Sequence, residues 1–292
     1  METTLFHVFR NTPLGREILM QSLYFCTEIN ASIVIYIPEY TKFLMYYDND
    51  VVQVDLDESY LTAPDTAKAH AQELARGANI APRFVQPKNF TASTLPDLPV
   101  NFDFMCCPRS ISDLSSRISL GHIGPKVRRI INAAHFPVLI PSSLFKEWQS
   151  ILVFFGGSVN AVKALKLGLR LSRETGKPVN LFTQADGKSK EAFEEIIAER
   201  GMADEVAQKV QTWHFFETGK FEHNLYTVPH NALTVMGAYG HGVVRDMLFG
   251  STMEMIQTHL PNTMLIAGPN YVMPPQYVVS PACQSPGAVL CW

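Results

Sequence analysis

Runs of hydrophobic residues alternate with amphipathic stretches along this chain, and the same order occurs twice. In the second half, the β-branched and aromatic run 150–155 precedes Gly156, Gly157 and Ser158. After Ser158, which is a suitable N-cap, small and apolar residues recur at helical spacing. These residues are Ala161, Ala164, Leu165, Gly168 and Leu169. The pattern predicts a buried strand that leads directly into a helix.

The rest of the second half continues this alternation. Apolar runs predict strands over 179–183, 211–216, 232–236 and 263–266, and helical spacing predicts helices over about 188–200 and 220–227. Strands that alternate with helices favour parallel pairing through right-handed crossovers. We therefore expect an open α/β sheet with helices on both faces.

The first half follows the same plan. Strands are expected over 5–9, 31–37, 102–107 and 137–140, and helices over 12–29, 65–76 and 126–134. A longer connection, rich in tyrosine and acidic residues, runs from 38 to about 62. The sequence VLIPS at 138–142 aligns with MLIAG at 264–268. The expected fold is two tandem Rossmann-like (flavodoxin-like) sandwiches, each a mainly parallel five-stranded sheet with helices on both faces.

The joint between the two units is expected near 141–148, which gives domains at 1–143 and 148–268. The two units are expected to pack through their last strands and helices as two pseudo-symmetric protomers. The remaining residues, 269–292, contain five prolines and no helical or strand period, so they predict an extended tail. Such a tail is either disordered or lies along the other half or a second subunit, through Tyr271, Val272, Met273 and 277–279.

A glycine-bearing loop follows the fourth predicted strand of the second half. Two residues separate Gly237 from Gly240, nine separate Gly240 from Gly250, and a helical pattern begins after Ser251 and Thr252. Glycines let backbone N–H groups approach a ligand, and a helix N-terminus adds unpaired donors and the positive end of a dipole. This combination favours an anion such as a phosphate, bound by backbone N–H groups and the Ser251 hydroxyl.

The spacing Gly-x2-Gly-x9-Gly-Ser closely resembles the nucleotide-loop signature of the universal stress protein family. The resemblance covers about residues 1–268 and is to the tandem, two-domain form. It implies a cytoplasmic stress-response protein that binds ATP or a related adenine nucleotide. The site residues that it implies are Met236, Gly237, Gly240, Gly250, Ser251 and Thr252, with Gly156 at a position that is acidic in family members.

Gly156 is a departure from the family pattern. The missing carboxylate removes a group that could contact the nucleoside or a magnesium ion, because magnesium prefers carboxylate and phosphate oxygens. The anion site does not depend on it. ATP or a related nucleotide therefore remains the expected ligand, and Mg2+ is only weakly supported.

The first half departs further from that pattern. Pro108 and Ile111 stand where Gly237 and Gly240 stand in the second half, and proline has no N–H while isoleucine adds a Cβ. His122 takes the place of Ser251, and Arg10 takes the acidic position. Arg10, Arg109 and Arg117 either converge on another anion or are scattered surface residues. We interpret this half as a degenerate copy retained for architecture.

The composition excludes several classes of partner. A formal net charge of −3 and a pI near 6.3 do not favour nucleic acid or an anionic membrane. No apolar run approaches the length of a membrane span, and the N-terminus lacks the layout of a signal peptide. Five cysteines, an odd number without paired metal spacing, fit a reducing cytoplasm. Adjacent Cys106 and Cys107 fall in an expected buried strand, where cysteine behaves as a small hydrophobe.

No nucleophile–base–acid set and no metal site is recognisable in the sequence. His214, His223 and His230 have no carboxylate or cysteine at ligand spacing. Chemistry would at most be slow ATP hydrolysis or autophosphorylation near Ser251 or Thr252. The leading hypothesis is regulation or partner contact controlled by a phosphorylated ligand in the C-terminal half. The alternative is a scaffold of the same family without nucleotide binding, which acts through protein contacts, including a further homodimer.

Overall fold

The computed structural model describes residues 2–61, 63–87, 95–109, 111, 123–238 and 260–274. The elements of the first half are β1 (Thr4–Val8), α1 (Pro13–Glu28), β2 (Ser32–Tyr36), β3 (Lys42–Tyr47), β4 (Asp50–Asp55), the 3-10 helix η1 (Glu58–Tyr60), α2 (Pro64–Gly77), β5 (Arg83–Phe84), β6 (Asp97–Leu98), β7 (Phe104–Cys106), α3 (Pro125–Ala133) and β8 (Val138–Ile140). Those of the second half are β9 (Ser150–Phe154), α4 (Val159–Thr175), β10 (Val179–Gln184), α5 (Lys190–Glu199), α6 (Ala203–Lys209), β11 (Val210–Phe216), α7 (Phe221–Asn224), the 3-10 helix η2 (Leu225–Thr227), β12 (Ala232–Gly237) and β13 (Met264–Ala267).

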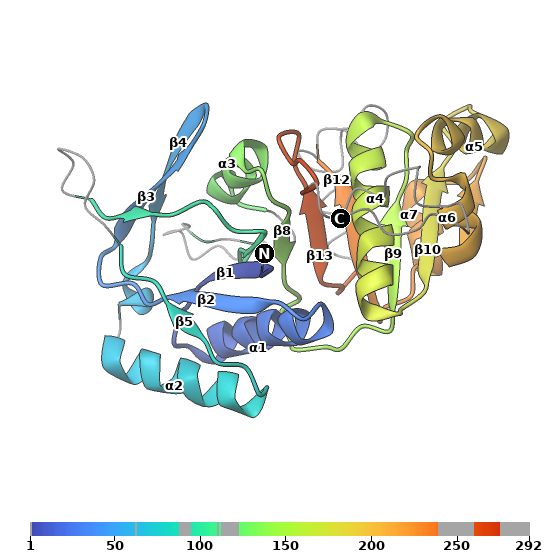
Figure 1. Cartoon of the computed structure of the whole chain (residues 1–292). Helices are drawn as coiled ribbons and strands as arrows, with labels where there is room; N and C mark the ends of the chain where they lie inside the picture. The colour runs from blue at the N-terminus through green and yellow to red at the C-terminus, as the bar shows by residue number, and fades with distance from the viewer. Residues whose placement is uncertain are drawn as a thin grey trace, which may run out of the picture.

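Ten of the strands form one continuous sheet, in the order β11-β10-β9-β12-β13-β8-β7-β1-β2-β5 (Figure 1). Each half contributes five neighbouring strands, and both sets have the same order when their strands are counted along the chain. The last strands of the two sets, β13 and β8, pair antiparallel with Leu265 opposite Leu139. Every other pairing in this sheet is parallel. The expected tandem α/β fold is confirmed, and its two five-stranded sheets are joined edge to edge.

Helices and a smaller sheet cover the two faces of the ten-stranded sheet. One face is covered by α1, α2, α4 and α5, whose apolar residues share a buried cluster with Leu5 and Val153. The other face is covered by α3, by the small sheet β4-β3-β6 and by the α7–η2 segment, which share a second buried cluster with Phe6 and Phe154. Consecutive strand residues therefore point to opposite faces. Both clusters contain residues of both halves.

The segment 38–62 contains more structure than the connection expected from the sequence. β3 and β4 pair antiparallel within it, and β6 adds to β3 in parallel. The side chains that face the core alternate along both strands: Phe43, Met45, Tyr47, Val52 and Val54. Leu44, Tyr46 and Val51, which point the other way, are also apolar, so the two-residue period is hidden in the sequence. The expected 220–227 helix is divided into α7 and η2. Helix α6 was not expected, since none of its residues is buried and its sequence therefore carries no apolar pattern of helical spacing.

Side chains as well as strands join the two halves. Lys177, just after α4, donates hydrogen bonds to Glu28 and to the Tyr24 hydroxyl (3.2 Å), both on α1. Its ammonium lies 4.5 Å from the centroid of the Trp148 ring. The Tyr24 hydroxyl in turn donates to the backbone oxygen of Trp148 (3.1 Å). This cluster ties the first helix of one half to the entry of the other.

The first residues after β13 lie between the two halves. Tyr271 is buried in the cluster that contains α4, and the Val272 N–H donates to the backbone oxygen of His135 (3.4 Å) just after α3. Asn270 donates to the backbone oxygen of Asn132 (3.0 Å). This segment therefore follows the second of the two interpretations of the tail, in which it lies along the other half. Residues 275–292 are outside the described part of the chain.

Candidate functional site

The carboxyl ends of β9 and β12 lie side by side where the order of strands reverses in the second half. β9 is the first strand of its set, it pairs with β10 on one side and β12 on the other, and Val153 is opposite Val235. Open α/β sheets bind ligands at such a switch point. The structure brings Gly156, which follows β9, together with Met236 and Gly237 at the end of β12. The other predicted site residues, Gly240, Gly250, Ser251 and Thr252, lie outside the described residues.

The N-terminus of α4 opens at this switch point. Ser158 is its N-cap, with its hydroxyl accepting a hydrogen bond from the Ala161 N–H (3.2 Å). The helix is 17 residues long and has no acidic residue in its first turn. Its positive dipole end is therefore not neutralised by a side chain of that turn, which makes the position favourable for an anion.

Gly237 has a structural role that the sequence did not reveal. A Cβ at this position would lie 2.2 Å from the backbone oxygen of Asn160 and 2.8 Å from the Ala161 nitrogen. Only glycine therefore lets β12 pack this closely against the start of α4. The Asn160 amide adds a hydrogen bond to the backbone oxygen of Ala238. Met236 is buried, so its side chain belongs to the core and only its backbone is available to a ligand.

The turn after β9 is fixed by side chains of the neighbouring strands. The Thr183 hydroxyl donates to the backbone oxygen of Phe155 (2.8 Å), and the Trp213 indole N–H donates to that hydroxyl (3.0 Å). Gly157 has a φ of +72°, a conformation that favours glycine, whereas Gly156 is not among the positive-φ residues. Position 156 can therefore take an L side chain without a left-handed backbone.

Lys163, which was not a sequence candidate, adds a positive charge at this end of the sheet. Its ammonium donates to the backbone oxygen of Pro269, two residues after β13. Burial lowers the pKa of this amine. Lys163 follows Ser158 by five residues and belongs to no motif that spacing could have identified. Its position depends on the contact between α4 and the segment after β13, which are far apart in the sequence.

The register of the strands relates the first half to this site. His7 is opposite Cys106, as Val153 is opposite Val235, so Arg10 corresponds to Gly156. By the same count, Pro108 corresponds to Gly237, as the sequence alignment predicts.

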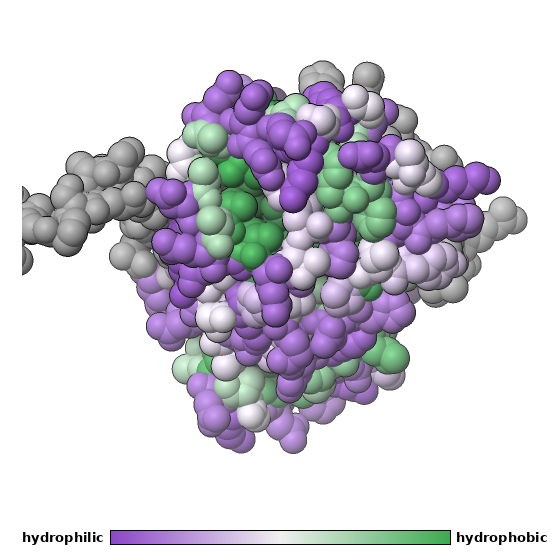
Figure 2. Space-filling view, turned by 90° about the vertical axis from the view of Figure 1, so that its right-hand side faces the viewer, coloured by the Kyte–Doolittle hydropathy of each residue, from purple (hydrophilic) through white to green (hydrophobic). Residues whose placement is uncertain are grey.

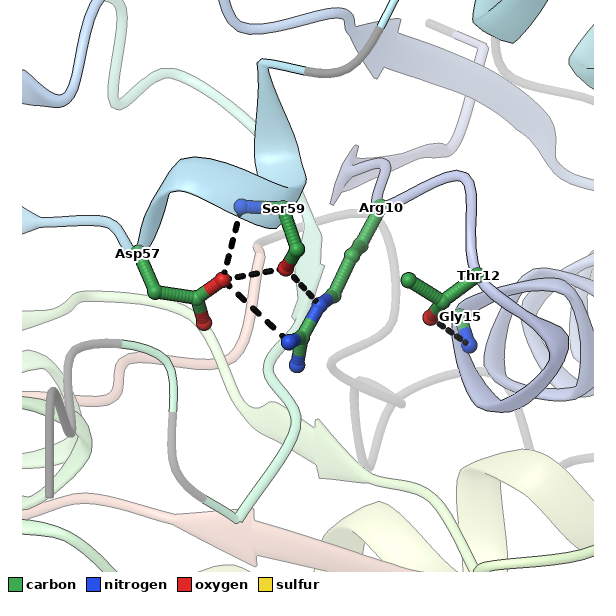
Figure 3. Close-up of polar contacts among 5 residues, drawn as sticks. All are labelled: Arg10, Thr12, Gly15, Asp57 and Ser59. Carbon is green, nitrogen blue, oxygen red and sulfur yellow. Dashed lines mark hydrogen bonds and ion pairs between the residues drawn. The ribbon is translucent and has the colours of Figure 1, made fainter. Parts of the chain in front are cut away.

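Arg10 is engaged within the first half (Figure 3). Its guanidinium donates to the Ser59 hydroxyl (2.5 Å) and pairs with Asp57 (3.2 Å), both from the segment after β4, and it lies over the Tyr60 ring. Thr12 caps α1 by accepting a hydrogen bond from the Gly15 N–H (3.1 Å). The segment between β4 and α2 thus supplies the partners of Arg10, the arginine at the position that is acidic in family members.

Those of the other first-half candidates that the structure describes do not form a comparable anion site. Ile111 is buried, and Arg109 is half-buried with a pKa lowered by burial. Arg117 and His122 lie outside the described residues. Within the described ranges, no group of three or more histidine, cysteine, aspartate or glutamate side chains is placed to hold a metal ion. Cys26, Cys106 and Cys107 are buried free thiols, and burial raises the pKa of Cys106 to about 12.

Comparison with known proteins relates this geometry to one family. No protein-family model matches the chain. A segment of 172 residues is 27% identical to a universal stress protein of Synechocystis sp.; it covers 57% of this chain and 58% of that protein. The chain thus matches somewhat more than half of that relative's length.

Two solved structures resemble nearly the whole chain. A universal stress protein from Archaeoglobus fulgidus has a TM-score of 0.60 at 15% identity, covering 91% of this chain and 98% of its own. A functionally unknown protein from Pseudomonas aeruginosa has a TM-score of 0.52 at 12% identity, covering 92% and 93%. At these identities the structures establish the fold. None of the described helices is long and apolar enough to cross a membrane. The chain therefore resembles universal stress proteins both in its sequence and in its α/β fold.

Proposed function

We propose that this chain is a cytoplasmic stress-response protein whose C-terminal half binds ATP, a related adenine nucleotide or another phosphorylated ligand. The observation that supports this proposal best is the meeting of the α4 N-terminus with the carboxyl ends of β9 and β12. Lys163 places a further positive charge at this end of the sheet. In the proposal, the loop from Gly240 to Ser251, which follows β12 in the chain, supplies the donors to the phosphates.

Binding would act by regulation rather than by fast chemistry. The groups described at this switch point are backbone groups, glycines, the Ser158 hydroxyl, which is already used as a helix cap, and the Lys163 ammonium, which donates to the backbone oxygen of Pro269. None of these is a general base for attack on a phosphate. Nucleotide binding would instead change the contacts that this end of the sheet offers to partners.

The second candidate function is a scaffold that does not bind nucleotide. Two observations favour it. Gly237 is required by the packing of α4 whether or not a ligand binds. Gly156 supplies no carboxylate, which removes a ligand for magnesium.

ATP titration by calorimetry, with the full chain and with Gly240→Val, separates the two functions. If the loop binds phosphate, the branched side chain should prevent close backbone approach and remove a couple of charge-assisted hydrogen bonds. Affinity should then fall by about 2–4 kcal/mol, or about 30- to 1000-fold. Arg10→Ala is the control in the other half and should leave affinity unchanged. An unchanged dissociation constant in a normally melting Gly240→Val protein would favour the scaffold.

A further inference from the structure

A short segment after β13 crosses from the end of the sheet that carries the proposed ligand site to the first half (Figure 1). We call residues 268–272 the strap. At one end, Lys163 of α4 donates a hydrogen bond to the backbone oxygen of Pro269. At the other, the Asn270 amide donates to the backbone oxygen of Asn132 (3.0 Å) in α3. The strap is therefore bonded to a helix of each half.

The strap completes the C-terminal end of α3. The last carbonyl groups of a helix have no partner within the helix, and Asn270 supplies one of them with a donor. The Val272 N–H donates to the backbone oxygen of His135 (3.4 Å), just after this helix. Gly268 permits the close approach, because a Cβ there would lie 1.9 Å from the backbone oxygen of Ile131. The end of α3 therefore depends on the position of the strap.

The α4 end of the strap lies beside the start of the loop 239–252. Asn160 precedes Lys163 by three residues and donates to the backbone oxygen of Ala238, the last described residue before that loop. The Ala238 N–H in turn donates to the backbone oxygen of Ala267 (2.8 Å), two residues before Pro269. Residues three apart in a helix are neighbours on one face. Lys163 therefore lies about one helical turn from the point where the loop begins.

The Lys163 ammonium has a neutral acceptor in this structure. It donates to the Pro269 carbonyl and forms no ion pair with another described residue. Burial lowers the pKa of this amine, and no nearby negative charge offsets the burial. A phosphate oxygen is a stronger acceptor for an ammonium than a carbonyl oxygen, because both partners are then charged. To reach a phosphate in the loop, the side chain must turn from the β13 side of α4 toward β12.

We propose that an anionic ligand in the C-terminal half takes the Lys163 ammonium from Pro269 and so releases the strap, which loosens the end of α3. This inference rests on the proposed function and says how the ligand site acts on the first half. His135 extends the effect, because its Nδ1 lies 3.1 Å from the backbone oxygen of Asn270 and its Nε2 lies 2.9 Å from Asp48 in the β3–β4 turn. By linkage, a weaker strap should favour the ligand.

ATP titration of full-chain variants by calorimetry tests the competition, because two substitutions should act in opposite directions. Lys163→Met should weaken ATP binding by at least about tenfold, since the phosphates lose a charged partner. Asn270→Ala should tighten it by about 2- to 10-fold, since a loosened strap competes less for the ammonium. Lys166→Met, at an exposed position of α4, and Asn231→Ala, at an exposed position before β12, are the matched controls and should leave affinity unchanged.

Hydrogen–deuterium exchange measures the release itself. Exchange should become faster at 125–135 and 268–274 when ATP binds, and also in ligand-free Lys163→Met. The outer side of the second half, which carries α5 and α6 (Figure 2), should be unchanged in that variant. In a chain that binds ATP, two substitutions that both weaken binding or both leave it unchanged, or a strap whose exchange does not change, would overturn the strap and leave the proposed function standing. If the unaltered chain does not bind ATP, the proposed function fails, and this regulation fails with it.

Discussion

His7 on β1 should make the stability of this protein depend on pH. Its side chain is 1% exposed, its Nδ1 lies 2.9 Å from the Ser22 hydroxyl of α1, and its Nε2 has no hydrogen-bond partner among the described residues. Burial lowers the pKa of His7 from 6.5 to about 3. The physical reason is that an imidazolium here would be removed from water with one N–H unpaired.

The sign and size of the effect follow from these two pKa values. Between pH 6.5 and pH 3 the unfolded chain binds a proton at this histidine and the folded chain does not. The stability from neutral His7 is therefore fully present above the unfolded pKa and decreases as pH falls toward the folded pKa. At 1.36 kcal/mol per pH unit, lowering the pH from about 7.5 to about 5 should remove about 2 kcal/mol of the free energy of unfolding.

Urea unfolding at these two pH values, followed by far-UV circular dichroism, measures the loss. The comparison is with His7→Gln, which keeps a polar partner for Ser22 and does not titrate. Its loss between the two pH values should be smaller by about 2 kcal/mol. Each protein is its own reference, so lower absolute stability of the variant does not matter. His223→Gln, at an exposed histidine, is the control for removal of an imidazole, and an unchanged loss in His7→Gln would refute the reasoning.

Three further predictions concern the packing and the site. Gly237→Ala should cost at least about 2–3 kcal/mol of unfolding free energy, measured by thermal melts, because its Cβ would lie 2.2 Å from the backbone oxygen of Asn160. Gly77→Ala is the control: its Cβ meets nothing within 4 Å, so it should be neutral or stabilising in the same assay. Gly156→Asp should keep its melting temperature and strengthen ATP binding or make it magnesium-dependent; a stable variant with no gain in calorimetry would put the scaffold function first. Lys177→Met should destabilise the chain by about 1–3 kcal/mol in urea unfolding, because Glu28 loses its partner. Addition of Glu28→Gln should recover part of that loss, and no recovery would contradict the pairing.

Much of the fold could be predicted because buried parallel strands are nearly continuous apolar runs. In β9 every residue after Ser150 is buried, and in β12 all six are. Such runs, followed by an N-cap such as Ser158, indicate strand and helix directly. The β3–β4 hairpin was not predicted, since the apolar residues Leu44, Tyr46 and Val51 on its outer face hide the alternation. Packing of the two halves through their last strands was expected, and the pairing of β13 with β8 agrees with it. The antiparallel register that places Leu139 opposite Leu265 could not be predicted, because periodicity describes single elements.

The candidate site could be predicted only in part, for a related reason. Spacing located Gly237, the family resemblance implied Gly156 and Met236, and the structure puts the three at one switch point. It could not show that Gly237 is needed for the approach of α4, which depends on a distance of 2.2 Å between segments far apart in the chain. Nor could spacing show that Arg10 pairs with Asp57, because Asp57 lies in the segment 38–62, whose strands periodicity did not predict.

Hydrogen–deuterium exchange of the full chain, with and without saturating ATP, tests the central claim most directly. We expect slower exchange at 154–161, at 236–238 and in the loop 239–252, because the ligand would contact the ends of β9 and β12, the start of α4 and the glycine loop. The corresponding segments of the first half, 8–15 and 106–111, should be unchanged. Protection confined to the first half, or no protection anywhere, would contradict ligand binding in the C-terminal half.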